Sequence, residues 1–172
     1  MEPPGGIAGL ESILQHNFVT YDTAQITLVP IDAAGRPADP GLYLNDFARD
    51  VCLTTALMYR RGRYQPPWIG YLAVLDGNVL GACAFLEPPR EGRVEIAYLT
   101  FPAFEHRGFG TAMAARLVAL ARATDPSVVV YAHTLALPHA SNAILGRLGF
   151  SFAGAVPDPE EGTLWEFQLR AA

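Results

Sequence analysis

The sequence lacks any apolar run close to the roughly 20 residues that a membrane-spanning helix requires. Its first six residues, Met-Glu-Pro-Pro-Gly-Gly, lack the basic region and the apolar segment of a secretory signal. Internal repeats and low-complexity linkers are also absent. These absences argue against a membrane partner and against secretion, and we expect a cytoplasmic protein.

Cysteine and positive charge are both scarce. Cys52 and Cys83 are the two cysteines, and neither belongs to a CxxC pair or has a companion histidine at metal-binding spacing. We therefore expect buried free thiols in a reducing compartment and no metal site. The 12 basic and 17 acidic residues give a formal net charge of −5. This balance argues against a nucleic-acid partner, which needs a concentrated basic face, and it favours a cationic substrate.

The expected order of elements is that of a mixed α/β (α+β) fold. Half of the residues are apolar, and we expect a single domain over residues 1–172, with 1–24 as an N-terminal extension whose residues 7–18 are compatible with a helix. Helical periodicity predicts helices at 43–59, after Gly108 and before Gly149. Strands are expected at 25–30, 71–75, 79–85, 93–101, 128–132, 150–156 and 163–169. The sum is a mixed, mostly antiparallel sheet of about six to seven strands with helices on both faces.

The most informative segment is residues 94–112, in which a strand, a turn containing Gly108 and Gly110, and a helix follow one another. Glycines let the backbone approach a ligand closely, and the free amides of a helix start favour an anion such as a pyrophosphate. Arg107 adds positive charge. A tight turn without a ligand is the alternative. A Rossmann site is disfavoured, because Met113 stands where its third glycine would be and the turn follows an antiparallel meander.

Two segments at the correct separation resemble the GNAT acetyltransferases, and the RimJ/RimL-like branch most closely. The first is Pro102 followed by the Gly108-Phe109-Gly110 turn, which is similar to the family's Q/R-x-x-G-x-G/A signature. The second is residues 132–150, a strand, loop and helix that resemble the segment ending in LxKLGF. The order of elements from 25 to 169 also agrees. The resemblance implies the GNAT fold.

The same resemblance implies acetyl-CoA as a co-substrate and no metal. Backbone groups at the end of the third meander strand would bind the pantetheine arm and polarise the thioester carbonyl, and they belong to Tyr98, Leu99 and Thr100. The pyrophosphate would lie on the amides of His106, Arg107, Gly108, Phe109, Gly110 and Thr111. The chain departs from the family at three positions. Glu105 replaces Q/R, Leu145 stands where some branches have a tyrosine general acid, and a family asparagine is missing, for which Asn142 is a candidate substitute.

Three residues are candidates for the chemistry of direct transfer, in which an amine attacks the thioester while both substrates are bound. Glu95 is the first candidate base, and a carboxylate that reaches solvent or pairs with an arginine is its alternative. His133, at the end of the buried strand, is the second, and a structural histidine is its alternative. Ser141 corresponds to a serine that RimL-like enzymes are proposed to use near the cofactor sulfur. Its alternative is an N-cap of the following helix.

The leading hypothesis is an acetyl-CoA-dependent N-acetyltransferase that acetylates a primary amine, on either a protein N-terminus or a small molecule. One alternative is a catalytically weak GNAT-like domain that binds acyl-CoA as a sensor or interaction module. Another is a nucleotide-binding regulatory domain without CoA. The apolar C-terminal strands would permit a homodimer.

Overall fold

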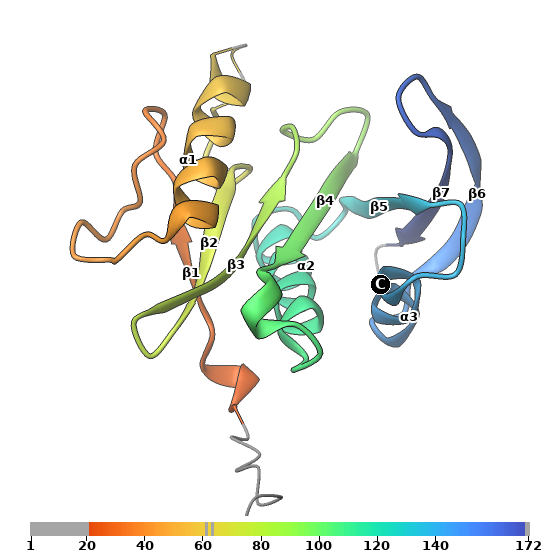
Figure 1. Cartoon of the computed structure of the whole chain (residues 1–172). Helices are drawn as coiled ribbons and strands as arrows, with labels where there is room; N and C mark the ends of the chain where they lie inside the picture. Colours follow the sequence, from red (N-terminus) through yellow and green to blue (C-terminus); the bar gives the residue numbers. More distant parts are fainter. Residues whose placement is uncertain (1–20, 61, 63, 171–172) are drawn as a thin grey trace, which may run out of the picture.

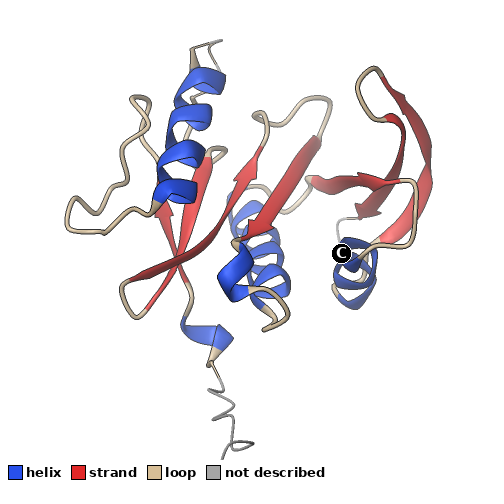
Figure 2. Cartoon of the chain, in the orientation of Figure 1, coloured by secondary structure: helices blue, strands red, loops and turns tan. Residues whose placement is uncertain are grey.

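The computed structural model describes residues 21–60, 62 and 64–170, so the helix expected at 7–18 lies outside the described residues. These residues form a seven-stranded sheet with three α-helices around it (Figures 1 and 2). The strands are β1 (Thr27–Pro30), β2 (Gly70–Leu75), β3 (Asn78–Phe85), β4 (Arg93–Thr100), β5 (Val129–Leu135), β6 (Ser151–Asp158) and β7 (Gly162–Leu169). The helices are α1 (Asp46–Tyr59), α2 (Phe109–Thr124) and α3 (Ala140–Arg147), with short 3₁₀ turns at Thr23–Gln25 and Pro102–Phe104.

The sheet is mixed, as the sequence predicts. Its order is β1-β2-β3-β4-β5-β7-β6, and only the β4–β5 pair is parallel among the strands described. Helix α1 lies on one face and α2 on the other (Figure 1). Along β4, Val94 and Ile96 are buried on the α2 side, whereas Glu95 and Ala97 face the side of α1. The GNAT-like arrangement of the sheet and helices is confirmed.

Two element boundaries differ by three residues from the sequence expectation. Helix α1 begins at Asp46 instead of 43, because the Asn45 side chain caps it by accepting a hydrogen bond from the Ala48 amide at 2.9 Å. Strand β5 runs to Leu135 instead of 132, because its residues stay paired with β7 along this length. His133 therefore lies within the strand and not at its end.

Apolar residues on both faces of the sheet build the core. On the α2 side, Met113 and Leu117 are fully buried against the sheet, and burial of such side chains contributes roughly 1.5–3 kcal/mol each. On the other side, the Tyr59 hydroxyl fixes α1 by donating to the Ile31 carbonyl at 3.3 Å and accepting from the Gly70 amide at 2.7 Å. Both cysteines are buried free thiols, as expected. Within the described ranges, every helix is too short or too polar to cross a membrane.

Candidate active site

The site begins where β4 and β5 separate. Their parallel pairing covers three residue pairs and ends at Glu95 and Tyr131. Beyond this point, β4 continues beside β3 while β5 continues beside β7. A cavity of about 620 Å³ opens along the end of β4, the turn before α2, and α3. Its lining includes most of the expected cofactor residues, namely Tyr98, Leu99, Thr100, His106, Gly108, Phe109, Gly110 and Thr111.

The glycine turn presents backbone amides to this cavity. Gly108 has φ +83° and is the N-cap of α2, with no side chain to satisfy the amides of the first turn. The first helical hydrogen bond runs from the Ala112 amide to the Gly108 carbonyl, so the amides of residues 109–111 precede it and have no acceptor within the helix. Such amides at the positive end of a helix dipole suit a phosphate group.

Gly110 is needed for space. A Cβ at this position would lie 3.0 Å from Ile144 Cδ1, 3.6 Å from Thr100 Oγ1 and 3.8 Å from Tyr98 Cδ2. All three neighbours line the cavity. A side chain at Gly110 would therefore occupy the floor of the cavity.

Charged side chains around the cavity differ from the sequence expectation in one respect. Arg107 is not among the lining residues, because its guanidinium donates to the Tyr21 hydroxyl at 3.0 Å and lies 5.3 Å from the centre of that ring. Arg147 of α3 lines the cavity instead and forms no ion pair with any described residue. Glu105 also lines the cavity. The free amides and Arg147 together suit an anionic ligand such as the pyrophosphate of CoA.

Helix α3 contributes Ser141 to the cavity, and Ser141 is not the N-cap. The N-cap is His139, whose Nδ1 accepts from the Ser141 amide at 3.3 Å, and Ser141 is the second residue of the helix. The Ser141 carbonyl is 3.5 Å from the hydroxyl of Tyr98. Asn142 is not a lining residue, because its amide donates to the Leu137 carbonyl at 3.0 Å in the preceding loop.

Tyr98 lines this cavity as a neutral phenol. Its burial raises the pKa of the hydroxyl to about 12. The ring lies on the α2 side of β4, where its Cδ2 is near Gly110, and the residue also contributes to the lining of a smaller apolar cavity of about 190 Å³ under α1. Tyr98 therefore offers a hydrogen-bond donor and no negative charge near neutral pH.

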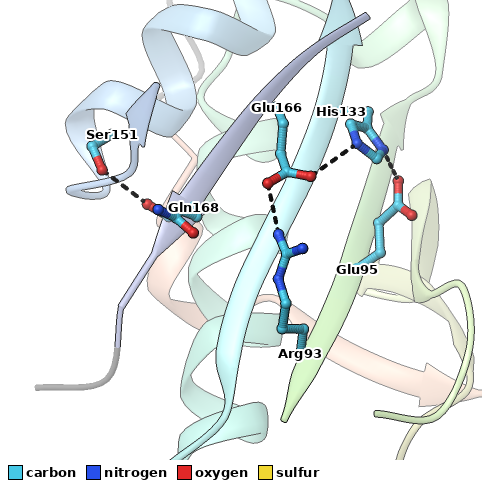
Figure 3. Close-up of polar contacts among 6 residues, drawn as sticks. All are labelled: Arg93, Glu95, His133, Ser151, Glu166 and Gln168. Atoms are coloured by element: carbon cyan, nitrogen blue, oxygen red, sulfur yellow. Dashed lines mark hydrogen bonds and ion pairs between the residues drawn. The ribbon is translucent and has the colours of Figure 1, made fainter. Parts of the chain in front are cut away.

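Glu95 and His133 meet on the face of the sheet that α1 partly covers. His133 Nδ1 lies 2.8 Å from Glu95 Oε1 (Figure 3). On the other side of the ring, Nε2 is 3.4 Å from Glu166 Oε2, close enough for an ion pair but without the alignment of a hydrogen bond. Glu166 Oε1 accepts a hydrogen bond from Arg93 at 2.6 Å. Strands β4, β5 and β7 thus build a four-membered polar network.

This geometry separates the two candidate bases. His133 Nε2 is buried, and its Nδ1 faces Glu95, so neither ring nitrogen is open to an incoming amine. Glu95 lines a cavity of about 360 Å³ together with Tyr131 of β5 and Met58 of α1. The carboxylate is therefore the member of the pair that a second substrate can reach.

Glu166, Arg93 and Arg147 are polar residues that the sequence reasoning did not single out. Alternation along β7 placed Glu166 on the face opposite Trp165 and Phe167, but the pairing of β7 with β5 could not be read from this pattern. Arg147 occupies the lysine position of the LxKLGF-like segment, so a signal for it was present. Among the described residues, no group of three His, Cys, Asp or Glu side chains has the geometry of a metal site.

Comparisons with known proteins agree with this geometry. The family model described as an acetyltransferase (GNAT) domain matches residues 40–151, more than half of the chain. No curated protein matches the chain in sequence. Because the family model matches more than half of its residues, the chain belongs to the GNAT acetyltransferase family, whose acyl donor is acetyl-CoA.

Solved structures share the fold at low sequence identity. Apo RimL, a ribosomal L7/L12 alpha-N-protein acetyltransferase, has a TM-score of 0.63 at 18% identity, over 86% of this chain and 94% of that chain. YncA of Salmonella typhimurium with acetyl-CoA has a TM-score of 0.59 at 19% identity, over 86% and 94%. The microcin C7 self-immunity acetyltransferase MccE, with acetyl-CoA and AMP, has a TM-score of 0.58 at 12% identity, over 72% and 69%.

Proposed function

We propose that the protein transfers the acetyl group of acetyl-CoA to a primary amine while both substrates are bound. One observation carries this proposal: the pairing of β4 with β5 ends at Glu95, and the cavity at the start of α2 begins three residues further along β4, at Tyr98. The donor and a carboxylate base would then lie at the two ends of one short segment, from Glu95 to Thr100.

The donor would lie along the unpaired edge of β4. Residues 96–100 of β4 pair with β3 on one side, and none of the described strands pairs with them on the other. Backbone groups on this open edge at Tyr98, Leu99 and Thr100 can bind the pantetheine arm and stabilise the charge that develops on the thioester oxygen. The pyrophosphate would lie on the amides of residues 109–111, with Arg147 as its counter-charge.

Glu95 would accept the proton that the ammonium form of the acceptor must lose. The amine nitrogen then forms a bond to the thioester carbon and the carbon–sulfur bond breaks; the nitrogen gives its second proton to the leaving thiolate, so the products are a neutral amide and the thiol of CoA. Ser141 lines the cavity, and its hydroxyl could donate a hydrogen bond to this thiolate. The proton taken by Glu95 returns to solvent through the cavity that Glu95 lines.

The acceptor we propose is either a protein N-terminus or a small-molecule amine, and the fold shared with RimL supports the first. The carboxylate at the acceptor side and the acidic net charge suit a cationic amine. We also propose a cytoplasmic location, because two buried free thiols suit a reducing compartment.

A domain that binds acyl-CoA without efficient catalysis is the second candidate. Two observations favour it: Glu105 places a carboxylate in the anion-binding cavity, and Leu145, at the position of a family tyrosine, is fully buried. Turnover separates the two candidates, because both require binding of acetyl-CoA and only the first releases free thiol in the presence of an amine.

The test combines binding with turnover. Calorimetry should show binding of acetyl-CoA and CoA, and absence of binding at millimolar ligand would contradict both candidates. Thiol release is then measured with short peptides that have free N-termini and with small primary amines. The chain contains no lysine, so its own side chains supply no primary amine to this assay.

Glu95→Gln is the decisive variant. We expect its kcat to fall by roughly 100-fold, the lower range for a general base, with unchanged affinity for acetyl-CoA. Asp76→Asn, which neutralises an exposed carboxylate in the β2–β3 turn, is the matched control and should keep wild-type activity. Full activity of Glu95→Gln would remove Glu95 as the base.

A further inference from the structure

His133 is held between two carboxylates that come from different strands. Its Nδ1 is 2.8 Å from Glu95 of β4, and its Nε2 is 3.4 Å from Glu166 of β7 (Figure 3). A neutral imidazole can donate a hydrogen bond from one nitrogen, and a protonated one can donate from both. The hydrogen bond to Glu95 on one side and the close approach of Glu166 on the other together restrict the orientation of the ring.

The strand register explains why the contact between Glu95 and His133 matters at the site. His133 and Glu166 are direct cross-strand partners, whereas the partner of Glu95 is Tyr131, two residues before His133. The pairing of β4 with β5 ends at this same Glu95. The Glu95–His133 contact is thus the side-chain link between the two strands at the point where their backbones separate.

Arg93 completes the arrangement and keeps its charge away from Glu95. Its guanidinium donates to Glu166 at 2.6 Å and lies 4.3 Å from the centre of the Tyr131 ring. The Glu166 side chain is 15% exposed, so this pair is more enclosed than an ordinary surface ion pair. Arg93 and Glu95 share one face of β4. Without Glu166, Arg93 would be free to pair with Glu95, and an arginine-paired carboxylate is a weaker base.

We propose that Glu166 is a positioning residue for acetyl transfer. Glu166, held by Arg93, fixes the His133 ring, and the ring fixes the Glu95 carboxylate toward the amine. Glu166 itself touches neither substrate, and no proton passes through it. The inference rests on the proposed function in one respect, namely that Glu95 is the base.

A double-mutant cycle tests the inference with an amine that the thiol-release assay identifies. We expect Glu166→Gln to lower kcat by about 10- to 100-fold at unchanged KM for acetyl-CoA, because a displacement of about 1 Å costs a reacting group up to roughly 100-fold. In the Glu95→Gln background, the same substitution should change kcat by less than about twofold, because Glu166 acts only through Glu95.

Three kinetic outcomes would overturn the inference. The first is a wild-type kcat in Glu166→Gln. If Glu95→Gln is impaired at the same time, this result overturns the role of Glu166 and leaves the proposed function intact. Losses that multiply in the double variant would show that Glu166 acts independently of Glu95. A weaker binding of acetyl-CoA in Glu166→Gln would indicate a general structural role. The failure of the proposed base is seen separately, as full activity of Glu95→Gln alone.

A second measurement needs no acceptor. The chain has four histidines, and the ring nitrogens of His133 can be assigned by nitrogen-15 NMR with a His133→Gln reference. Glu166→Gln should shift the His133 signals and leave the other histidine signals in place. The matched control is Gln168→Ala, two residues along β7 and outside the network (Figure 3). Unshifted His133 signals in Glu166→Gln, or an equal shift in the control, would overturn the inference.

Discussion

Gly110→Ala separates ligand binding from folding at the anion-binding cavity. Gly110 is the second residue of α2 and has no positive φ angle, so an alanine fits the helical backbone. Its new methyl group would lie 3.0 Å from Ile144 Cδ1, the far end of a flexible side chain, and within 4 Å of Thr100 and Tyr98. The methyl group therefore enters the cavity floor while the backbone keeps its shape.

The two expected effects have opposite signs. Alanine is favoured over glycine within a helix by up to about 1 kcal/mol, and the contact with Ile144 offsets part of this gain, so the free energy of unfolding should change by less than about 1 kcal/mol. In the cavity, an extra methyl group against a well-packed ligand should reduce the binding free energy by about 1–3 kcal/mol, the usual cost of overpacking. The dissociation constant for acetyl-CoA should therefore rise by about 5- to 150-fold.

Calorimetry with acetyl-CoA and urea unfolding measure the two quantities on the same variant. Gly146→Ala is the matched control, because Gly146 is also helical but a Cβ there would meet nothing within 4 Å. This control should gain about 0.5–1 kcal/mol in stability and bind acetyl-CoA as the wild type does. If Gly110→Ala binds acetyl-CoA with wild-type affinity, the assignment of this cavity to the cofactor is refuted.

Two further predictions concern charge and pH. Arg147→Gln should weaken acetyl-CoA binding by roughly tenfold, about 1.5 kcal/mol for the loss of one charge-assisted hydrogen bond. In calorimetry at high salt, the difference in affinity between this variant and the wild type should become smaller. Equal affinities at low salt would contradict a role for Arg147. Burial raises the pKa of Tyr59, Tyr71 and Tyr98 from 10 to about 12. These phenols stabilise the fold fully below pH 10, and this contribution is lost as the pH rises toward 12. Absorbance at alkaline pH should therefore show at least three late-titrating tyrosines, and ionisation of Tyr59, Tyr71 and Tyr98 near pH 10 would contradict their burial.

Much of the fold could be predicted because its signals are local. Alternation, turn residues and helical periodicity each depend on neighbours a few positions apart, and they predicted the meander, the later hairpin and the mixed sheet. The end of β5 was misplaced, because a strand ends where its partner stops pairing, and the partner β7 lies some thirty residues later in the chain. This error also placed His133 at a strand end instead of inside β5.

The cofactor side of the candidate site was largely accessible to sequence reasoning. The expected glycine turn lines the cavity, as do Tyr98, Leu99, Thr100 and Ser141. Arg107 and Asn142 are the two expected cofactor residues that do not line the cavity. Their side chains donate hydrogen bonds elsewhere, to the Tyr21 hydroxyl and to the Leu137 carbonyl. Backbone amides at a helix start have a direction set by the helix itself, whereas a long side chain points wherever tertiary contacts allow.

The sequence by itself determined the glycine turn at the start of α2, because Gly108 at the N-cap sets the backbone shape and the helix that follows leaves its first amides free. Tertiary structure alone decided which polar side chains surround Glu95. Arg93, Glu95, His133 and Glu166 come from three strands that are distant in the chain and become neighbours only through the β4–β5–β7 pairing. That pairing buries His133 Nε2 and leaves the Glu95 carboxylate accessible, which is why Glu95 and not His133 is the proposed base.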